Sequence, residues 1–335
     1  MDRFPMGLNT YCLRAMRWHD LKLLDYTAGL KLDAVFLQDS IDPGVNDPAH
    51  WKEVKEYAAR LGLHLETGTG ASLPHTPDRF DASVKLLRDA IRRAAGMGSP
   101  LVRTLVASDR QSLPPGPAEK HIETMIKLLR TLRSEAMDAG VKFAIENHKD
   151  LFCRQTRQLI DGAGKEFVGS YLDTGNPVFV MEDPLQTVET LGPVAVTLHL
   201  RDSVVYETRT GVAVQWVPLG EGVVDFRRII ALAKEICPPL YVYIKPITGR
   251  PPQNLAILEP EFWKIWPDAR ASDVARFLAL AKSGHPYERD MVVEDVAGRS
   301  NIETFAAALQ FQQRDHMERS VEYGKKVLDL GVKWR

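Results

Sequence analysis

The stretch FAIENHKDLF, residues 143–152, joins a short apolar run to a cluster of polar side chains. The apolar run has the length and composition of a buried β-strand, and Glu146, Asn147 and His148 follow at its end. Burying ionisable groups costs free energy unless a metal, a polar ligand or an opposite charge compensates. A strand that ends in this way indicates a functional site at the mouth of a sheet.

The same rhythm extends over most of the chain. Short runs rich in Val, Ile, Leu and Phe alternate with longer amphipathic stretches, which is typical of βα units and a parallel sheet. The predicted strands are residues 6–12, 34–38, 63–67, 101–106, 142–147, 168–173, 196–201 and 241–245. Eight units predict an α/β fold that closes as a (β/α)8 TIM barrel. A doubly wound nucleotide-binding sheet would need a glycine-rich turn after the first strand, and CLRAMRW stands there instead.

Amphipathic stretches between the strands predict helices, among them 50–62, 82–98, 118–140 and 225–236. Beyond the last strand, segments 260–268, 271–284 and 302–331 look mainly helical and exceed what the eighth barrel helix requires. We therefore expect a barrel over residues 1–250 and a C-terminal helical extension over 251–335. The extension would cover the barrel or contact a neighbouring subunit.

Composition excludes several classes of protein. The 335 residues carry a formal net charge of -1 with no basic stripe, which argues against nucleic acid as a partner. A repair endonuclease on this fold would need many more His and acidic ligands and a basic groove. No apolar run approaches the roughly 20 residues of a membrane span, and the N-terminus lacks a signal peptide's apolar segment. We expect a cytoplasmic protein with three reduced cysteines.

Three strand ends carry side chains suited to chemistry. Glu146, Asp173 and His199 end neighbouring predicted strands and are separated by 27 and then 26 residues, about one βα unit each. Active sites of TIM barrels lie where the strands end. Two carboxylates and an imidazole form a mixed ligand set that suits Mn, Co, Fe, Mg or Zn. The alternative is that each side chain only caps a loop or forms a salt bridge.

Residues two apart on a strand face the same side, which extends the predicted site. The pairs that share a face are Glu146 with His148, Asp173 with Tyr171, and His199 with Arg201. Glu146 would bind a metal and His148, one step further out, would face the substrate. The alternative for His148 is a residue that orients a loop.

Four motifs carry a resemblance to a known family: IENH at 145–148, YLDTGN at 171–176, LHLRD at 198–202 and PLGEGVVDF at 218–226. Residues 6–250 resemble the sugar phosphate isomerase/epimerase superfamily with the xylose-isomerase-like TIM barrel. Its members include ketose 3-epimerases, inosose dehydratases and isomerases, and lyases that act on 3-keto C-glycosides. The resemblance implies that Glu146, Asp173 and His199 bind a divalent metal, with Mn expected first and Co, Mg, Fe or Zn as alternatives.

One position departs from the family. Relatives typically supply a fourth ligand, a Glu, at the end of strand eight, where this chain has Lys245. A protonated ammonium cannot bind a cation and adds positive charge to the site. Three outcomes stay open: a three-ligand metal site completed by water and substrate, a lysine that takes part in proton transfer, or a barrel that has lost its metal.

The expected reaction is proton transfer next to a carbonyl. A cation polarises the carbonyl, a base takes the neighbouring proton, and the cation stabilises the enediolate. This predicts a sugar isomerase or epimerase. In the related epimerases, two metal-bound glutamates from strands five and eight transfer the protons, which implies a catalytic role for Glu146. Lys245 stands in place of the second glutamate, so His148 is the natural alternative base. The alternatives are a 3-keto-glycoside β-eliminating lyase that uses His148, and a degenerate barrel that binds sugar without turnover.

Further residues are assigned more loosely. Candidates for binding the substrate are Arg201, Asn9, Tyr11, Glu66 and Arg250. A salt bridge with a strand-end carboxylate would explain Arg201 equally well, and barrel packing would explain the tyrosine and Glu66. The expected partner is a small sugar or glycoside. A homo-oligomer is expected, with a small accessory subunit as a further possibility that the related lyases suggest.

Overall fold

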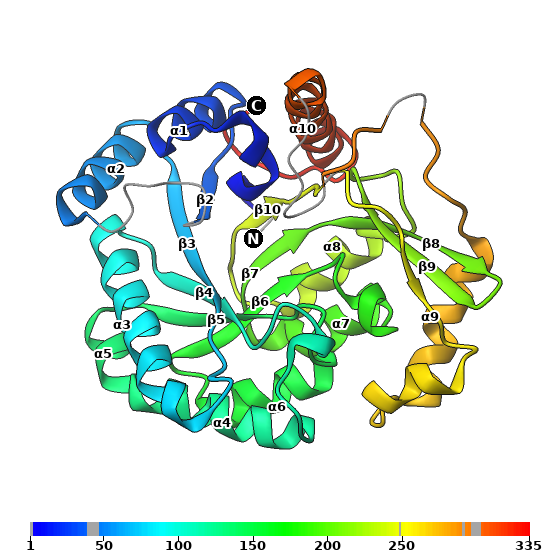
Figure 1. The fold of residues 1–335 in the computed structure, drawn as a ribbon. Helices are drawn as coiled ribbons and strands as arrows, with labels where there is room; N and C mark the ends of the chain where they lie inside the picture. Colours follow the sequence, from blue (N-terminus) through cyan, green and yellow to red (C-terminus); the bar gives the residue numbers. More distant parts are fainter. Residues whose placement is uncertain (1–2, 39–46, 248, 290–291, 296–302) are drawn as a thin grey trace.

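The computed structural model describes residues 3–38, 47–247, 249–289, 292–295 and 303–335. Eight parallel strands close into a barrel in the order β1-β10-β7-β6-β5-β4-β3-β2 (Figure 1). The strands are β1 Met6–Asn9, β2 Ala34–Gln38, β3 His64–Ala71, β4 Leu101–Leu105, β5 Lys142–Glu146, β6 Val168–Asp173, β7 Ala195–Leu200 and β10 Val242–Ile244. The predicted (β/α)8 barrel is therefore confirmed.

Helices surround the barrel, and several begin at sequence signals for a helix start. Asp47 and Asp183 each accept a backbone hydrogen bond two residues ahead and precede a proline, the residue favoured at the first helical position. The α-helices are α1 Asp20–Gly29, α2 Pro48–Arg60, α3 Phe80–Met97, α4 Ala118–Thr131, α5 Arg133–Asp138, α6 Cys153–Ala163, α7 Pro184–Leu191, α8 Phe226–Ile236, α9 Ala271–Ser283 and α10 Glu303–Lys326. The 3-10 helices are η1 Thr10–Met16, η3 Pro77–Arg79, η4 Arg110–Ser112, η5 Pro177–Val180, η6 Gly192–Val194 and η7 Pro260–Ile265. The helix predicted over 118–140 is two helices, because the chain leaves helical geometry at Leu132.

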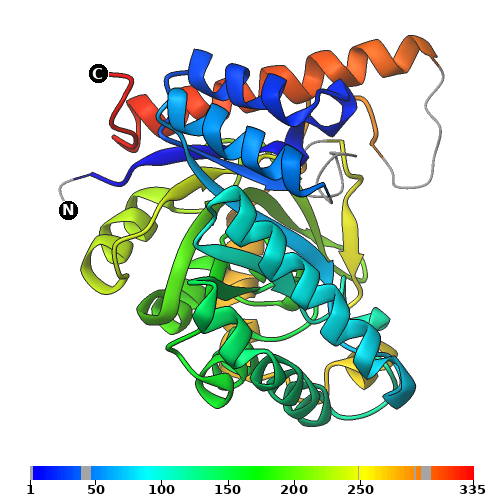
Figure 2. The same ribbon diagram turned by 90° about the vertical axis from the view of Figure 1, so that its left-hand side faces the viewer.

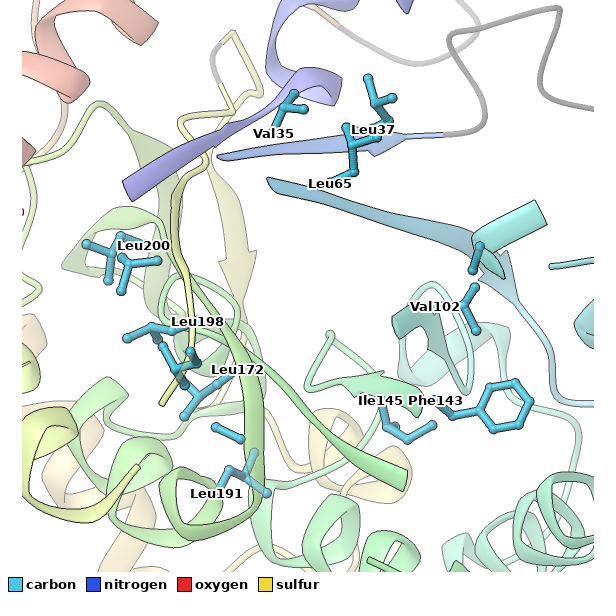
Figure 3. Close-up of a cluster of buried hydrophobic side chains, with 14 of the residues drawn as sticks. Val35, Leu37, Leu65, Val102, Phe143, Ile145, Leu172, Leu191, Leu198 and Leu200 are labelled. Carbon is cyan, nitrogen blue, oxygen red and sulfur yellow. The ribbon is translucent and has the colours of Figure 1, made fainter. Parts of the chain in front are cut away.

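Strand side chains alternate between two cores. Outward-facing side chains form the large core between strands and helices (Figure 3). They include Val35, Leu37, Phe143, Ile145, Leu198 and Leu200. Inward-facing side chains fill the barrel itself with Ala34, Phe36, Leu101, Ala144, Tyr171 and Tyr243. The period of two therefore fixes which residues beyond each strand can reach the mouth of the barrel.

A small antiparallel sheet stands beside the barrel and differs from the sequence expectation. The strands β8 Asp202–Thr208 and β9 Gly211–Val217 form a hairpin directly after β7, and β11 Gln253–Leu255 pairs with β9. The hairpin packs with α9 over a second apolar cluster that includes Val205, Val214 and Phe277 (Figure 1). Residues 251–335 are thus not wholly helical, since β11 completes this sheet.

The last helix returns to the barrel. Tyr26 of α1 donates a hydrogen bond to Glu318 of α10 over 3.0 Å, and Tyr323 of α10 packs against Phe226 of α8. Helix α10 therefore lies between α1 and α8 and completes the outer ring; Figure 2 shows it running alongside α1. Ile302, the first residue of the helix predicted over 302–331, lies outside the described residues. None of the described helices combines the length and apolarity that crossing a membrane requires.

Candidate active site

The strands of the barrel open at their carboxyl ends into a cavity of about 840 Å³. Its lining combines residues from different βα units: Arg103 of β4, His148 and Lys149 after β5, Arg201 after β7, and Lys245 and Arg250 after β10. Tyr11, Phe179 and Trp216 add aromatic walls. This is the end of a TIM barrel at which catalytic side chains collect.

Lys245 lies between the two buried carboxylates at the base of this cavity. Its Nζ donates to Oε1 of Glu146 at 2.9 Å and to Oδ2 of Asp173 at 3.1 Å. Both carboxylate side chains are fully buried, and Lys245 is 5% exposed. A charged trio in this position is stable only because each charge meets an opposite one.

Two arginines complete the charge cluster. Arg103 pairs with Oε2 of Glu146 and also donates to the carbonyl of Thr69 at 2.7 Å. Arg201 pairs with Oδ2 of Asp173 at 3.0 Å. Burial alone would raise the pKa of Glu146, but Arg103 and Lys245 hold it well below its usual range. Among the residues that the structure describes, three cations thus surround two carboxylates, a net charge of +1.

The motifs around the cluster hold the carboxylates in place. Asp173 accepts hydrogen bonds from the backbone N–H groups of Gly175 and Asn176 at 2.9 and 3.0 Å. The Asn176 amide donates to Glu146 at 3.0 Å, while the Asn147 side chain bonds both backbone groups of Asp173. A Cβ on Gly175 would lie 2.6 Å from Cγ of Arg201, so this position accepts only glycine without a shift. The ENH and DTGN stretches therefore act together as one scaffold.

His199 lies one layer deeper in the barrel than the carboxylates. Its ring is stacked between Tyr171 and Tyr243, with centroid distances of 3.8 and 4.7 Å. Nε2 lies 3.3 Å from the Thr197 hydroxyl, and Nδ1 has no hydrogen-bond partner within the described part of the chain. Burial, reinforced by Lys245, lowers the pKa of His199 well below its usual range, so the ring is neutral.

The predicted metal ligands are therefore not assembled as one site. In the part of the chain that the structure describes, no three His, Cys, Asp or Glu side chains lie close enough to bind one metal ion. Glu146 and Asp173 are brought together, but the ammonium of Lys245 already bridges them. A divalent cation there would meet that ammonium and a cluster that is already positive. The residues present do not fit the expected metal, and one unpartnered nitrogen on His199 does not change this.

His148 is placed as a base at the wall of the cavity. Its Nδ1 lies 2.7 Å from the carbonyl oxygen of Ser108. A carbonyl only accepts, so Nδ1 carries the proton and Nε2 keeps its lone pair. Burial lowers the pKa of His148, with Glu146 opposing the change. The imidazole is therefore neutral at physiological pH.

The looser substrate assignments divide into two groups. Tyr11, Arg201 and Arg250 line the cavity, although Arg201 also forms the predicted salt bridge with Asp173. Asn9 is buried, donates to the hydroxyl of Tyr171 at 3.2 Å and caps η1, so it packs the barrel instead of lining the cavity. Because β1 ends at Asn9, Tyr11 lies on η1 and not on the strand predicted over residues 6–12.

Glu66 lies at the opposite end of the barrel. The strand predicted to end at residue 67 continues to Ala71, so Glu66 is in its interior and not at its mouth. It lies 3.4 Å from Nε2 of His64 and lines a separate hollow at the amino ends of the strands. Burial raises its pKa. Glu66 therefore does not line the main cavity.

Four residues of the site were not assigned from the sequence. Arg103 pairs with Glu146, Asn176 supports it, Lys149 lines the cavity, and Trp216 packs against the guanidinium of Arg201 at 4.4 Å. Arg103 could have been found from the sequence, since it is the charged residue inside the apolar run LVRTLV and a buried charge requires a partner. Lys149 directly follows the ENH motif. Trp216 gave no signal, since it depends on the unexpected hairpin.

Comparison with known proteins identifies the fold family and its relatives. The family described as xylose isomerase-like TIM barrel matches residues 24–244. A 3-oxo-isoapionate decarboxylase from Pectobacterium atrosepticum is 23% identical over 237 residues, which cover 66% of this chain and 78% of that protein. A D-psicose 3-epimerase crystallised with D-fructose superposes with a TM-score of 0.63 at 15% identity, over 97% of this chain and 99% of the other. An IolI protein with a bound zinc atom has a TM-score of 0.58 at 15% identity, over 82% and 95% of the two chains.

Proposed function

The chain belongs to the xylose isomerase-like TIM barrel family, and from that premise we propose that it is an enzyme that transfers a proton next to the carbonyl group of a sugar-like substrate. The ketose epimerase among its structural neighbours supports this reaction class. The observation that carries the proposal is a neutral His148 that faces the same cavity as Lys245 and Arg201. A base and a group of cations at one cavity are what enediolate chemistry needs.

In the proposed reaction each group has one task. The carbonyl oxygen of the substrate lies towards Lys245 and Arg201, whose charges favour the oxyanion of the enediolate over the neutral ketone. His148 takes the proton from the neighbouring carbon at Nε2. Return of a proton to the same carbon on the opposite face gives an epimer, and return to the adjacent carbon gives an isomer. Elimination from a 3-keto glycoside would begin with the same proton abstraction.

The proposal includes no metal step. Lys245 provides the positive charge that a divalent ion supplies in metal-dependent catalysis, and it does so from a fixed position between Glu146 and Asp173. This corresponds to the third outcome left open by the sequence, a barrel that has lost its metal. The expected manganese is therefore not part of the proposed mechanism.

A deuterium-exchange experiment tests the proposal. Purified protein is incubated in heavy water with D-fructose, D-fructuronate or D-fructose 6-phosphate, and deuterium next to the carbonyl is followed by NMR. We expect exchange with at least one compound and a loss of at least about 100-fold in His148→Gln, the usual contribution of a general base. His285→Gln, which changes an exposed histidine, is the matched control and should exchange normally.

The contrary results are distinct. Absence of exchange by the wild-type protein with all three compounds would reject proton transfer on this substrate class. Exchange that is unchanged in His148→Gln would reject His148 as the base. Binding of a compound without exchange would instead favour the degenerate sugar-binding barrel.

A second candidate function is decarboxylation of a 3-oxo sugar acid. The cationic lining of the cavity favours it, and the related 3-oxo-isoapionate decarboxylase supports it. When the bond to the carboxyl carbon breaks, its electron pair moves into the enolate, CO₂ leaves, and the carbon later takes a proton. The same cations would stabilise that enolate. Release of CO₂ from a 3-oxo sugar acid, measured alongside deuterium exchange, separates the two reactions.

A further inference from the structure

Among the residues that the structure describes, cationic side chains outnumber acidic ones around the cavity. Five cationic side chains line it: Arg103, Lys149, Arg201, Lys245 and Arg250. None of the lining residues that the structure describes is Asp or Glu. The two carboxylates behind the wall, Glu146 and Asp173, balance only part of this charge. A neutral sugar would leave the excess uncompensated.

The excess is concentrated on Lys149 and Arg250. Within the described part of the chain neither side chain pairs with a carboxylate, whereas the nearby Arg14 pairs with Asp295 and Arg110 with Asp268. Lys149 is half-buried, so its charge is incompletely hydrated. Its Nζ is held 5.5 Å from the ring centroids of both Phe179 and Trp216. The aromatic faces orient the ammonium without neutralising it.

The two charges approach the cavity from different elements. Lys149 follows β5 and Arg250 follows β10, and two other strands separate these in the barrel order. Burial is the main cause that lowers the pKa of Lys149; the charge of Asp109 opposes this change, and the charges of Arg201 and Arg250 add to it. Like charges gathered around one cavity destabilise the free protein. Binding of an anion would remove that cost.

We propose that Lys149 and Arg250 bind the anionic group, a carboxylate or a phosphate, of a sugar-like substrate whose carbonyl end lies towards Lys245 and His148. This rests on the function proposed above and assigns the substrate class: an anionic sugar derivative instead of a neutral ketose. A cavity of about 840 Å³ is within the range for small-molecule sites, so it has room for such a molecule.

The binding test uses three compounds that differ only at carbon six: D-fructose, D-fructuronate and D-fructose 6-phosphate. Calorimetry should give at least about 10-fold tighter binding for one or both anionic compounds than for D-fructose, because charge-assisted hydrogen bonds are the stronger ones. Which anion binds more tightly distinguishes a sugar acid from a sugar phosphate. The advantage should shrink as salt is added.

Variants then assign the charge to these residues. Lys149→Gln and Arg250→Gln should each weaken binding of the preferred anionic compound about 10- to 100-fold and leave D-fructose binding unchanged. The matched control is Arg276→Gln, which changes an exposed arginine on α9 that pairs with Glu189. It should bind all three compounds like the wild type.

Three results would overturn the assignment: no preference of the wild type for either anion, equal losses for neutral and anionic compounds, or the same loss in Arg276→Gln. Because binding is measured and not turnover, the outcome is independent of the deuterium-exchange experiment. Anion preference without exchange would leave this assignment intact and reject the proposed reaction. Exchange without anion preference would reject this assignment and leave the proposed reaction intact.

Discussion

Lys245 decides the electrostatics of the active centre. Its ammonium contacts both Glu146 and Asp173, and all three side chains are buried. Removing one partner of a buried ion pair typically costs about 3–5 kcal/mol because the remaining charge is left uncompensated. Arg103 and Arg201 still reach the carboxylates without it, so the lower end of that range is expected here.

Substitution of Lys245 tests whether the lysine stands where a metal would bind. Lys245→Glu changes the cluster from a net charge of about +1 to about -1 and adds an oxygen ligand, conditions that favour Mn²⁺. We expect added Mn²⁺ to raise the melting temperature of Lys245→Glu. The same addition should leave the wild type and Lys245→Met unchanged.

The measurement is a thermal melt with and without Mn²⁺, together with metal analysis of each protein. Lys245→Met is the matched control, since it removes the ammonium without adding a carboxylate, and it should lose about 3 kcal/mol of unfolding free energy. One Mn²⁺ per wild-type chain, or a melting shift in the wild type, would restore the three-ligand metal site.

At the level of single residues, the sequence predicts which side chains face inward but not how deep they lie. The period of two correctly places Glu146, Asp173 and Lys245 on the inner side of the barrel. How deep a side chain lies in the barrel depends on the tilt and stagger of the strands. The sequence spacing between strand ends does not reveal either quantity. His199 is therefore found in the aromatic layer below the carboxylates, and Glu66 lies at the far end.

At the level of elements, the hairpin of β8 and β9 builds one wall of the cavity. Trp216 of β9 packs against Arg201 at 4.4 Å and against Lys149 at 5.5 Å, and its indole N–H donates to the carbonyl of Gly175 at 3.0 Å. The hairpin inserted after β7 thus packs against Lys149, which follows β5, and against Arg201, which follows β7. No strand is predicted over residues 202–217, because the regular βα rhythm favours a helix after each strand. The structure has the hairpin of β8 and β9 there.

Substitutions of Trp216 test this support. Trp216→Ala removes both the ring and the hydrogen bond, so urea unfolding should show a loss of about 3 kcal/mol. Trp216→Phe keeps an aromatic ring and loses only the indole donor, which should cost about 1 kcal/mol. Equal losses in the two variants would mean that the ring itself contributes little and that the hydrogen bond accounts for the stabilisation.

For the whole molecule, α10 ties the end of the chain to its beginning. The helix lies between α1 and α8, and its Met317 and Val321 are buried in the main core. The barrel strands could be predicted from the sequence because each is locally apolar, whereas the position of α10 depends on contacts across about 300 residues. The boundary at residue 250, the homo-oligomer and the cytoplasmic location stay predictions.

The burial of His316 on α10 predicts a pH dependence of stability. Burial lowers its pKa from an ordinary 6.5 to about 4. Between these values the unfolded chain binds a proton that the folded chain does not, so the free energy of unfolding falls as pH is lowered from 6.5 towards 4. The contribution approaches about 3 kcal/mol at most, since one pKa unit corresponds to about 1.4 kcal/mol.

Urea unfolding at several pH values measures this effect. His316→Gln should show a flatter dependence of unfolding free energy on pH between 4 and 6.5 than the wild type. His285→Gln, an exposed position, should retain the wild-type slope. If the curves of His316→Gln and the wild type run parallel through this window, protonation of His316 does not oppose folding.

The ammonium between Glu146 and Asp173 also determines what the active centre needs from its surroundings. A cation that is covalently part of the chain cannot be exchanged or extracted by a chelator, and it is present as soon as the barrel has folded. If the proposed metal-free reaction holds, such a centre would work equally well in metal-starved and metal-replete cells. Its reactivity cannot be varied by binding ions of different size and acidity. The charge of the ammonium depends instead on pH.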